Sequence, residues 1–268
     1  MTITATPPRP EAGALLRSWR ERRQLSQLEL ALRADSSARH ISFVENGRAR
    51  PSQALLLRLA DQLDVPVRER NSLLLAAGYA PLYPERPLDD PELRGLREAM
   101  ERLLAAHEPY PALVVDGTYQ VVAANRALGV LLAGVSEHLL APPVNAMRLT
   151  LHPEGMAPRI RNLAQWRGHL LRQMERQLAL VRSEPLRALY EEVSAYPVTD
   201  PGADDPTRPA PFALPLRVEH GGRVLSFLST IATFNTPMDV TVSELAMETF
   251  LPADAPTAAY LQALDLDR

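Results

Sequence analysis

The 268-residue chain contains no cysteine, which excludes disulfide-stabilised scaffolds, thiolate metal sites and cysteine nucleophiles. All 29 basic residues are arginine, so lysine is absent as well. Without lysine there is no Schiff-base amine, no serine–lysine dyad and no lysine for a Walker-type phosphate loop. These two absences remove several large classes of enzyme.

Long apolar runs are also absent. No run approaches the roughly 20 residues that span a bilayer, and the opening MTITATPPRP is too polar and too rich in proline for a signal peptide. We therefore expect a cytoplasmic protein without membrane insertion. The motifs HExxH, GxSxG and GxGxxG are missing too. We expect neither enzymatic activity nor a metal or cofactor.

Charge is distributed unevenly along the chain. The net charge of −3 combines a basic N-terminal part with an acidic remainder. Residues 1–80 hold 12 arginines against 8 acidic residues, whereas residues 81–268 hold 17 against 24. Hydrophobic residues make up 46% of the chain, enough for packed cores. This pattern is typical of a nucleic-acid-binding module joined to a second domain.

After an expected flexible tail over residues 1–11, residues 12–80 predict five short helices. Ser26 and Glu29 form a capping box at the start of the second helix. The third helix is expected from Ser37 to the stop signal at Asn46 and Gly47. Short connections and regular apolar spacing predict one all-α domain over residues 12–80.

The second and third of these helices have the pattern of a helix-turn-helix. Such a motif needs small and aliphatic residues where its helices cross, a short turn, and polar residues on the outer face. The crossing is expected at Leu30, Ala31, Ile41 and Val44, and the turn at residues 34–36. The outward-facing residues are expected to be Arg39, Ser42 and Phe43.

The stretch SQLELALRADSSARHISFVENGRARPS resembles the helix-turn-helix of the XRE/Cro-repressor family. The family usually has glycine where Asp35 stands, and aspartate tolerates the left-handed backbone of such a turn. The resemblance implies double-stranded DNA as partner, with Gln27 on a phosphate. It implies that the third helix lies over the major groove and that the residues after it follow the flanking phosphates. The DNA-binding residues that it indicates are Gln27, Ser37, Ala38, Arg39, Ser42, Phe43, Asn46, Arg48 and Arg50.

Two of these interpretations have structural alternatives. Phe43 contacts a thymine methyl in one interpretation and belongs to the small core in the other. Arg17, Arg20 and Arg23 are expected to point away from the apolar face of the first helix. They either approach DNA or form a solvated surface.

Residues 81–92 are proline-rich and acidic, and predict a linker to a second domain over residues 93–268. A helix is expected over 92–106, then two strands joined by Asp116-Gly117, with Asn125 capping a short helix. Residues 144–196 are expected to be helical, with the longest helix over 156–182. Three late strands, two of them joined at Gly221-Gly222, and a final helix near 255–264 complete an antiparallel sheet carrying helices.

This second part resembles the ligand-binding domain of MmyB-like regulators, a PAS-like fold, in PALVVDGTYQVVAAN and LSFLSTIATFNTPMDVTVSELAMETFLPAD. The fold class is thus multidomain, α for the N-terminal domain and α+β for the C-terminal one. The resemblance implies a small-molecule effector, a fatty acid or similar amphiphile, and a homodimer. Helical spacing places a cation, an amide, an indole and an imidazole on one face, suited to a carboxylate: Arg159, Asn162, Trp166 and His169.

These four residues have an alternative role as a polar network that supports the fold. The function predicted for the whole chain is a sequence-specific transcription regulator that senses a small molecule. The alternative is a DNA-binding adaptor or antitoxin whose C-terminal domain binds a protein partner.

Overall fold

A computed structural model of the chain describes residues 12–181, 183–197 and 213–264. Their contacts form two compact units, Met1–Glu85 with Thr236–Ser243, and Arg86–Asn235 with Glu244–Arg268. The division after Glu85 falls inside the predicted linker 81–92. The sequence assigned Thr236–Ser243 to the C-terminal domain, whereas its contacts group it with the N-terminal unit. The predicted tail over residues 1–11 lies outside the described residues.

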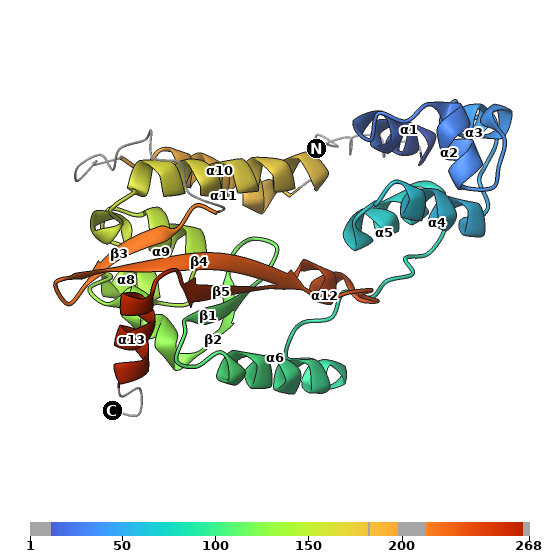
Figure 1. Ribbon diagram of the computed structural model, residues 1–268. Coiled ribbons are helices and arrows are strands. Elements are labelled where there is room, and N and C mark those ends of the chain that lie inside the picture. Colours follow the sequence, from blue (N-terminus) through green and yellow to red (C-terminus); the bar gives the residue numbers. More distant parts are fainter. Residues whose placement is uncertain (1–11, 182, 198–212, 265–268) are drawn as a thin grey trace, which may run out of the picture. The chain divides into compact units, whose positions relative to one another are not determined.

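The N-terminal unit contains the five predicted helices, blue to cyan in Figure 1. They are α1 (Ala12–Arg22), α2 (Gln27–Arg33), α3 (Ala38–Glu45), α4 (Gln53–Gln62) and α5 (Val67–Ala76). The capping box of α2 is confirmed, since the Ser26 hydroxyl accepts from the Glu29 amide and the Glu29 carboxylate accepts from the Ser26 amide. Ser37 caps α3 by accepting a hydrogen bond from the His40 amide at 3.1 Å.

Aliphatic side chains fill the crossing of α2 and α3, as the sequence predicted. Leu30, Ala31, Ile41 and Val44 are all at most 1% exposed. Asp35 takes the left-handed backbone that the turn requires, with φ of +49°. The helix-turn-helix is therefore formed despite the missing glycine.

The residues after α5 continue the N-terminal unit. The Asn71 side chain accepts from the amides of Leu82 and Tyr83, both at 3.1 Å, and donates to the Tyr83 carbonyl at 2.7 Å. The amide of Val240 then donates to the Pro84 carbonyl at 2.8 Å. Val240 opens α12 (Val240–Glu244), a short helix between the last two strands of the sheet. These contacts explain why residues 236–243 belong to this unit.

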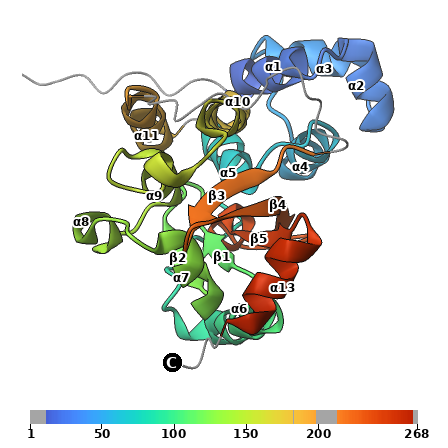
Figure 2. The ribbon, with the colours of Figure 1, turned by 60° about the vertical axis from the view of Figure 1, so that its left-hand side comes forward.

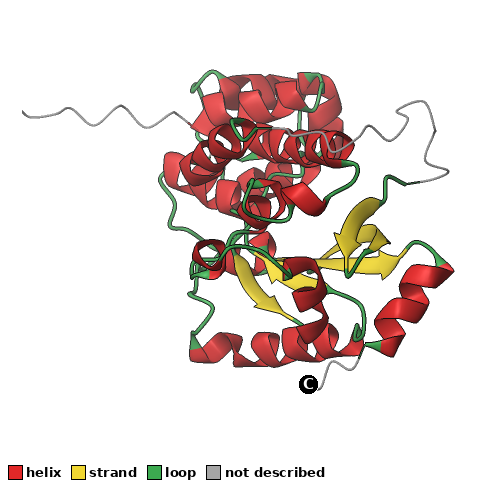
Figure 3. Cartoon of the chain, turned by 90° about the vertical axis from the view of Figure 1, so that its left-hand side faces the viewer, coloured by secondary structure: helices red, strands yellow, loops and turns green. Residues whose placement is uncertain are grey.

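The C-terminal unit is built on one antiparallel sheet of five strands in the order β2-β1-β5-β4-β3. Figure 3 shows the strands in yellow as one twisted sheet. The predicted combination of two early strands, a helical insert and three late strands is confirmed. The strands are β1 (Ala112–Val115), β2 (Val121–Ala124), β3 (Leu216–His220), β4 (Arg223–Thr233) and β5 (Ala246–Pro252).

Helices cover both faces of this sheet (Figures 1 and 2). Alternate residues of β1 point to opposite faces, so Leu113 joins the large core with α10, whereas Val114 packs with Met100 and Leu104 of α6. The helices of this unit, with three 3₁₀ turns, are η1 (Pro91–Leu93), α6 (Arg94–Ala106), η2 (Arg126–Leu128), α7 (Gly129–Leu132), α8 (Glu137–Leu140), α9 (Ala146–Leu151), η3 (Ala157–Arg159), α10 (Leu163–Leu180), α11 (Glu184–Ser194) and α13 (Ala255–Ala263).

Two local predictions for the first hairpin need correction. The strands β1 and β2 are joined by residues 116–120 and not by a two-residue turn, because the Asp116 carboxylate accepts from the Thr118 amide and hydroxyl and from the Gln120 amide. Asn125 precedes η2 but does not cap it, because its side chain bonds the backbone of Ala112 and residues 104 and 110. By contrast, Gly221 and Gly222 form the predicted two-residue turn, both with positive φ.

The expected single helix over residues 156–182 is also wrong. The chain there forms η3, an extended residue at Ile160, and then α10. Ile160 makes an antiparallel bridge to Val218, which requires extended backbone and prevents a continuous helix. Over the described residues, no helix combines the length and apolar character needed to cross a membrane.

Candidate functional site

The first candidate site is the outer face of α3. One face of α3 is buried against α2, so Arg39 on the opposite face is exposed. Its guanidinium carbon lies 5.3 Å from the centre of the Phe43 ring. Within the described part of the chain, Arg39 makes no other side-chain interaction. Ala38, Ser42 and Phe43 are half-buried beside it, and Ser37 is exposed at the helix start.

A buried carboxylate fixes α1, α2 and α3 to one another. Glu45 at the end of α3 accepts two hydrogen bonds from Arg20, at 2.6 and 2.9 Å, and one from the side-chain amide of Gln27 at 2.8 Å. The hydrogen bond to Glu45 raises the pKa of Arg20 above its ordinary value. The sequence predicted an outward-facing Arg20, and this is wrong, because its partner lies 25 residues further along the chain.

Arg17 of α1 and Arg23, which directly follows this helix, are each held within the unit. Arg17 pairs with Glu21 at 2.8 Å on the exposed surface. Arg23 donates to the carbonyls of Leu63 and Asp64 at 2.8 and 3.0 Å. The interactions of Arg17 and Arg23 are therefore explained within the protein and give no support to the interpretation that they approach DNA.

The residues expected along the flanking phosphates differ in how they are held. Asn46 donates back to the Ser42 carbonyl at 2.8 Å, and Arg50 donates to the Ala77 carbonyl at 2.9 Å while lying over the Tyr79 ring. Arg48 is exposed, and no described residue pairs with it. Gln27 is pinned by Glu45, so its predicted phosphate contact, which stays a prediction, starts from a side chain of fixed orientation.

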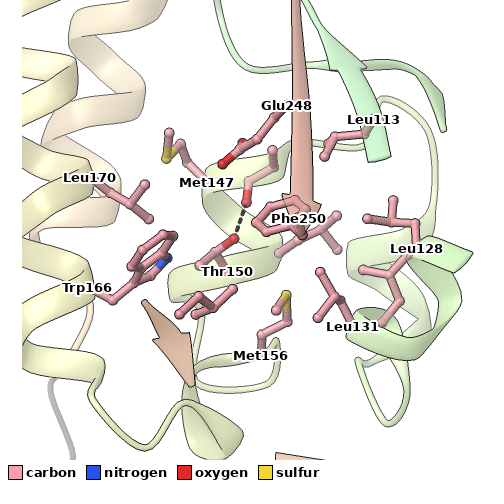
Figure 4. A pocket seen from close by; sticks show the side chains of 14 residues that line it. Leu113, Leu128, Leu131, Met147, Thr150, Met156, Trp166, Leu170, Glu248 and Phe250 are labelled. Atoms are coloured by element: carbon pink, nitrogen blue, oxygen red, sulfur yellow. Dashed lines mark hydrogen bonds between the residues drawn. The ribbon is translucent and has the colours of Figure 1, made fainter. Parts of the chain in front are cut away.

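The second candidate site is a cavity of about 40 Å³ inside the C-terminal unit. It lies between the sheet and the helices α9 and α10 (Figure 4). Its lining is mostly aliphatic, with two methionines and two aromatic rings. The residues are Leu113, Leu128, Leu131, Leu132, Ala146, Met147, Leu149, Thr150, Met156, Trp166, Leu170, Leu216, Glu248 and Phe250.

Polar side chains in this lining are few. The Thr150 hydroxyl donates to the Ala146 carbonyl at 2.8 Å, so its hydrogen is already used. Glu248 on β5 accepts a hydrogen bond from the Ser229 hydroxyl at 2.5 Å. Burial raises the pKa of Glu248, and the Ser229 hydrogen bond opposes that rise only in part. Burial also raises the pKa of the nearby Tyr119 to about 12.

Of the four residues predicted to hold a ligand, Trp166 alone is in the cavity lining. Arg159 lies in η3 and donates to the carbonyls of Leu131 and Glu219. Asn162 donates to the Pro215 carbonyl at 2.8 Å and accepts from the Arg217 amide at 3.1 Å. These contacts agree with the alternative role, a polar network that supports the fold.

His169 lies against Trp166 with ring centres 5.4 Å apart. Burial, and then the charges of Arg176 and Arg172, lower the pKa of His169, which favours its neutral form. The four residues do not share one helix face, because Arg159 precedes the break at Ile160.

Glu248 is not among the residues predicted from the sequence. A signal was present, because Ala246, Glu248 and Phe250 alternate along β5 and therefore share one face of the strand. An acidic residue on the apolar face of a strand is rare unless it has a partner or a function.

Comparisons with known proteins agree with this division of the chain. Residues 96–264 match the MmyB-like transcription regulator ligand binding domain, and residues 16–70 match a helix-turn-helix family. A Bacillus subtilis (strain 168) HTH-type transcriptional regulator, RghRB, is 34% identical over 106 residues, covering 39% of this chain and 68% of that protein.

A solved structure, the clp gene regulator ClgR from Corynebacterium glutamicum, is 28% identical. The match covers 38% of this chain and 99% of that one, with a TM-score of 0.23. The family match over residues 96–264 spans more than half of the chain. The chain therefore belongs to the MmyB-like transcription regulators, DNA-binding proteins in which a helix-turn-helix precedes a ligand-binding domain.

Proposed function

We propose that α3 reads base edges in the major groove and that Arg39 is its principal specificity residue. The observation that carries this proposal is the exposed, unpaired guanidinium of Arg39 on a helix whose other face is buried in the helix-turn-helix crossing. Arginine binds guanine through two parallel hydrogen bonds to O6 and N7. The ring of Phe43 beneath Arg39 restricts the side chain, which lowers the entropy lost on binding.

The neighbouring residues complete this reading surface. Ala38 and Phe43 offer apolar contact, for which a thymine methyl is the natural partner. Arg48 is free to neutralise a phosphate, a contact that adds affinity without sequence preference. The remaining predicted DNA-binding residues help to position α3 and can also contact DNA directly. They are Gln27, Ser37, Ser42, Asn46 and Arg50.

The cavity is the proposed effector site. Its apolar lining favours an apolar or amphiphilic molecule, such as a fatty acid or a similar chain. At about 40 Å³ it is far smaller than the roughly 300–1,000 Å³ of ordinary ligand pockets. Ligand entry therefore requires the cavity to widen, and the flexible side chains of Met147 and Met156 suit such an adjustment.

The chain path links this cavity to the N-terminal unit. Glu248 and Phe250 lie on β5, which begins two residues after α12 ends at Glu244. The preceding residues of α12 belong to the N-terminal unit, where the Val240 amide binds the Pro84 carbonyl. A displacement of β5 by a ligand would thus act on a segment attached to the DNA-reading unit. As a cytoplasmic homodimer, the protein would read two half-sites about one DNA turn apart.

DNA affinities of three variants test the reading surface. We expect Arg39→Ala to weaken binding of the full chain to its selected duplex by roughly 5- to 150-fold, with little change on random duplex. Arg48→Ala should weaken binding to both duplexes alike, and it should lower the number of ions released on DNA binding by about one. Arg102→Ala is the matched control, because it removes the same charge from an exposed position on α6 in the other unit. Equal losses for Arg39→Ala on both duplexes would contradict the proposal.

A further inference from the structure

Glu248 places a carboxyl group in a cavity that is otherwise apolar. It lies on β5 between the core residues of the sheet, and Figure 4 shows its carboxyl group at one end of the cavity. Moving an ionisable group from water into such surroundings is costly unless it is paired or hydrogen-bonded. Glu248 therefore needs either a function or a strong structural partner.

The protein supplies little compensation for this carboxyl group. Among the described residues, the Ser229 hydroxyl is its one hydrogen-bond donor, at 2.5 Å. No arginine or histidine belongs to the cavity lining. A carboxylate has room for about four hydrogen bonds, so most of its accepting capacity remains unused. The second carboxyl oxygen is available to a molecule in the cavity.

We propose that the effector carries a protonated amine on an apolar body, and that Glu248 binds this amine. The inference rests on the proposed function, in which the cavity holds the effector. An ammonium group offers three donors to Glu248 and cancels its charge. The ring of Trp166, also in the lining, presents a face to which a cation is attracted.

A carboxylate head group fits this cavity poorly. It would place a second negative charge near Glu248, and like charges in a buried site disfavour ionisation of both groups. The lining offers no cation to neutralise it. The carboxylate head group of a fatty acid is thus less favourable here than an amine. The apolar chain of a fatty acid does suit the aliphatic wall.

Matched eight-carbon probes test the head group. Octylamine, octanoate and octanol are titrated into the full chain, with calorimetry as the readout. We expect octylamine to bind at least 10-fold more tightly than octanoate. Glu248→Gln should weaken octylamine binding by 10-fold or more and leave octanol nearly unchanged. Glu101→Gln, which replaces an exposed glutamate of α6, should change the affinity for neither octylamine nor octanol.

The pH dependence of the unmodified protein provides a second readout, should Glu248→Gln fail to fold. Octylamine stays protonated up to about pH 10, as a lysine side chain does. Its affinity should therefore rise as the pH increases through the raised pKa of Glu248, whereas octanol affinity stays flat. Tyr119, the titratable group near Glu248, has a pKa raised to about 12 and does not titrate in this range. No charged side chain of α9 or α10 belongs to the cavity lining.

The outcomes separate this inference from the proposed function. The amine proposal is wrong if octanoate binds as tightly as octylamine. It is also wrong if the affinity for octylamine changes neither with Glu248→Gln nor with pH. In both cases the cavity remains the proposed effector site. If none of the three probes binds, both the amine proposal and the effector cavity fail.

Discussion

Glu45 is the residue on which the geometry of the reading helix most depends. Its side chain is 1% exposed and accepts hydrogen bonds from Arg20 on α1 and Gln27 on α2. Loss of one partner of a buried ion pair leaves the other charge without compensation. The orientation of α3 therefore rests on a carboxylate buried inside the N-terminal unit.

Substitution Glu45→Gln should lower the free energy of unfolding of the N-terminal unit by about 3–5 kcal/mol. Chemical denaturation of the full chain in a Trp166→Phe background, followed by Trp19 fluorescence, measures this change. Glu21→Gln removes an exposed partner of Arg17 on the same unit and is the control, with little effect expected. A small effect of Glu45→Gln, equal to that of the control, would show that the buried pair does not fix α3.

Single residues also show where sequence reasoning succeeds and where it ends. The buried crossing residues and the exposed Arg39 follow from helical periodicity, which is a local property. Alternation along β5 places Glu248 on an apolar face, but the surroundings of Arg20 and Glu248 do not follow from local periodicity. The environment of each is set by residues distant in sequence, Glu45 for Arg20 and the cavity wall for Glu248.

At the scale of elements, the cap of α3 is a local device with a measurable contribution. The Ser37 hydroxyl accepts from the His40 amide and satisfies one of the free amides at the helix start. Ser37→Ala should destabilise the N-terminal unit by about 1 kcal/mol, whereas Ser37→Asn, which retains a capping group, should not. Equal stabilities of the two variants in thermal denaturation would exclude the capping role.

The helices α9 and α11 are joined by Arg148 and Glu192, with hydrogen bonds of 2.6 and 2.8 Å. The hydrogen bond from Arg148 lowers the pKa of Glu192. A lowered folded-state pKa contributes stability above the ordinary value of about 4.3, and this stability is lost as the pH falls through the lowered pKa.

Glu192→Gln should therefore remove part of the acid sensitivity of the C-terminal unit. Melting temperatures of the protein and the variant, measured from neutral to acid pH, should differ most at neutral pH and converge at low pH. A constant difference across the series would show that the pair does not contribute through ionisation.

Element boundaries show a similar limit of prediction. Caps such as Ser26 and Ser37 and the Gly221-Gly222 turn are encoded locally, so the sequence locates these ends well. The 116–120 connection and the break at Ile160 depend on side-chain and strand contacts with distant residues. Local turn and helix signals therefore predicted the wrong local structure at both places.

At the scale of the whole molecule, the two units are joined by more than one passage of the chain. Contacts assign Thr236–Ser243 to the N-terminal unit, although the flanking strands β4 and β5 belong to the C-terminal unit. The contacts also divide after Glu85, within the residues 81–92 whose composition predicts a linker. The second connection was missed, because residues 236–243 join the N-terminal unit through a backbone hydrogen bond to Pro84, which has no sequence signature.

Amide hydrogen exchange tests whether this second connection is a cooperative part of the N-terminal unit. Asn71→Ala removes the acceptor of the Leu82 and Tyr83 amides. We expect it to accelerate exchange at both amides and at Val240, whose amide binds the adjacent Pro84. Unchanged protection of Val240 would show that the segment is held independently of α5.

The central claim is that α3 reads DNA through Arg39, and selection of bound sequences from random duplex DNA tests it most directly. The full chain should enrich a defined motif. Arg39→Ala should enrich the same motif with the preference lost at a guanine position, while Arg102→Ala leaves the motif intact. A motif unaltered by Arg39→Ala, or no enrichment by the unmodified chain, would contradict the account.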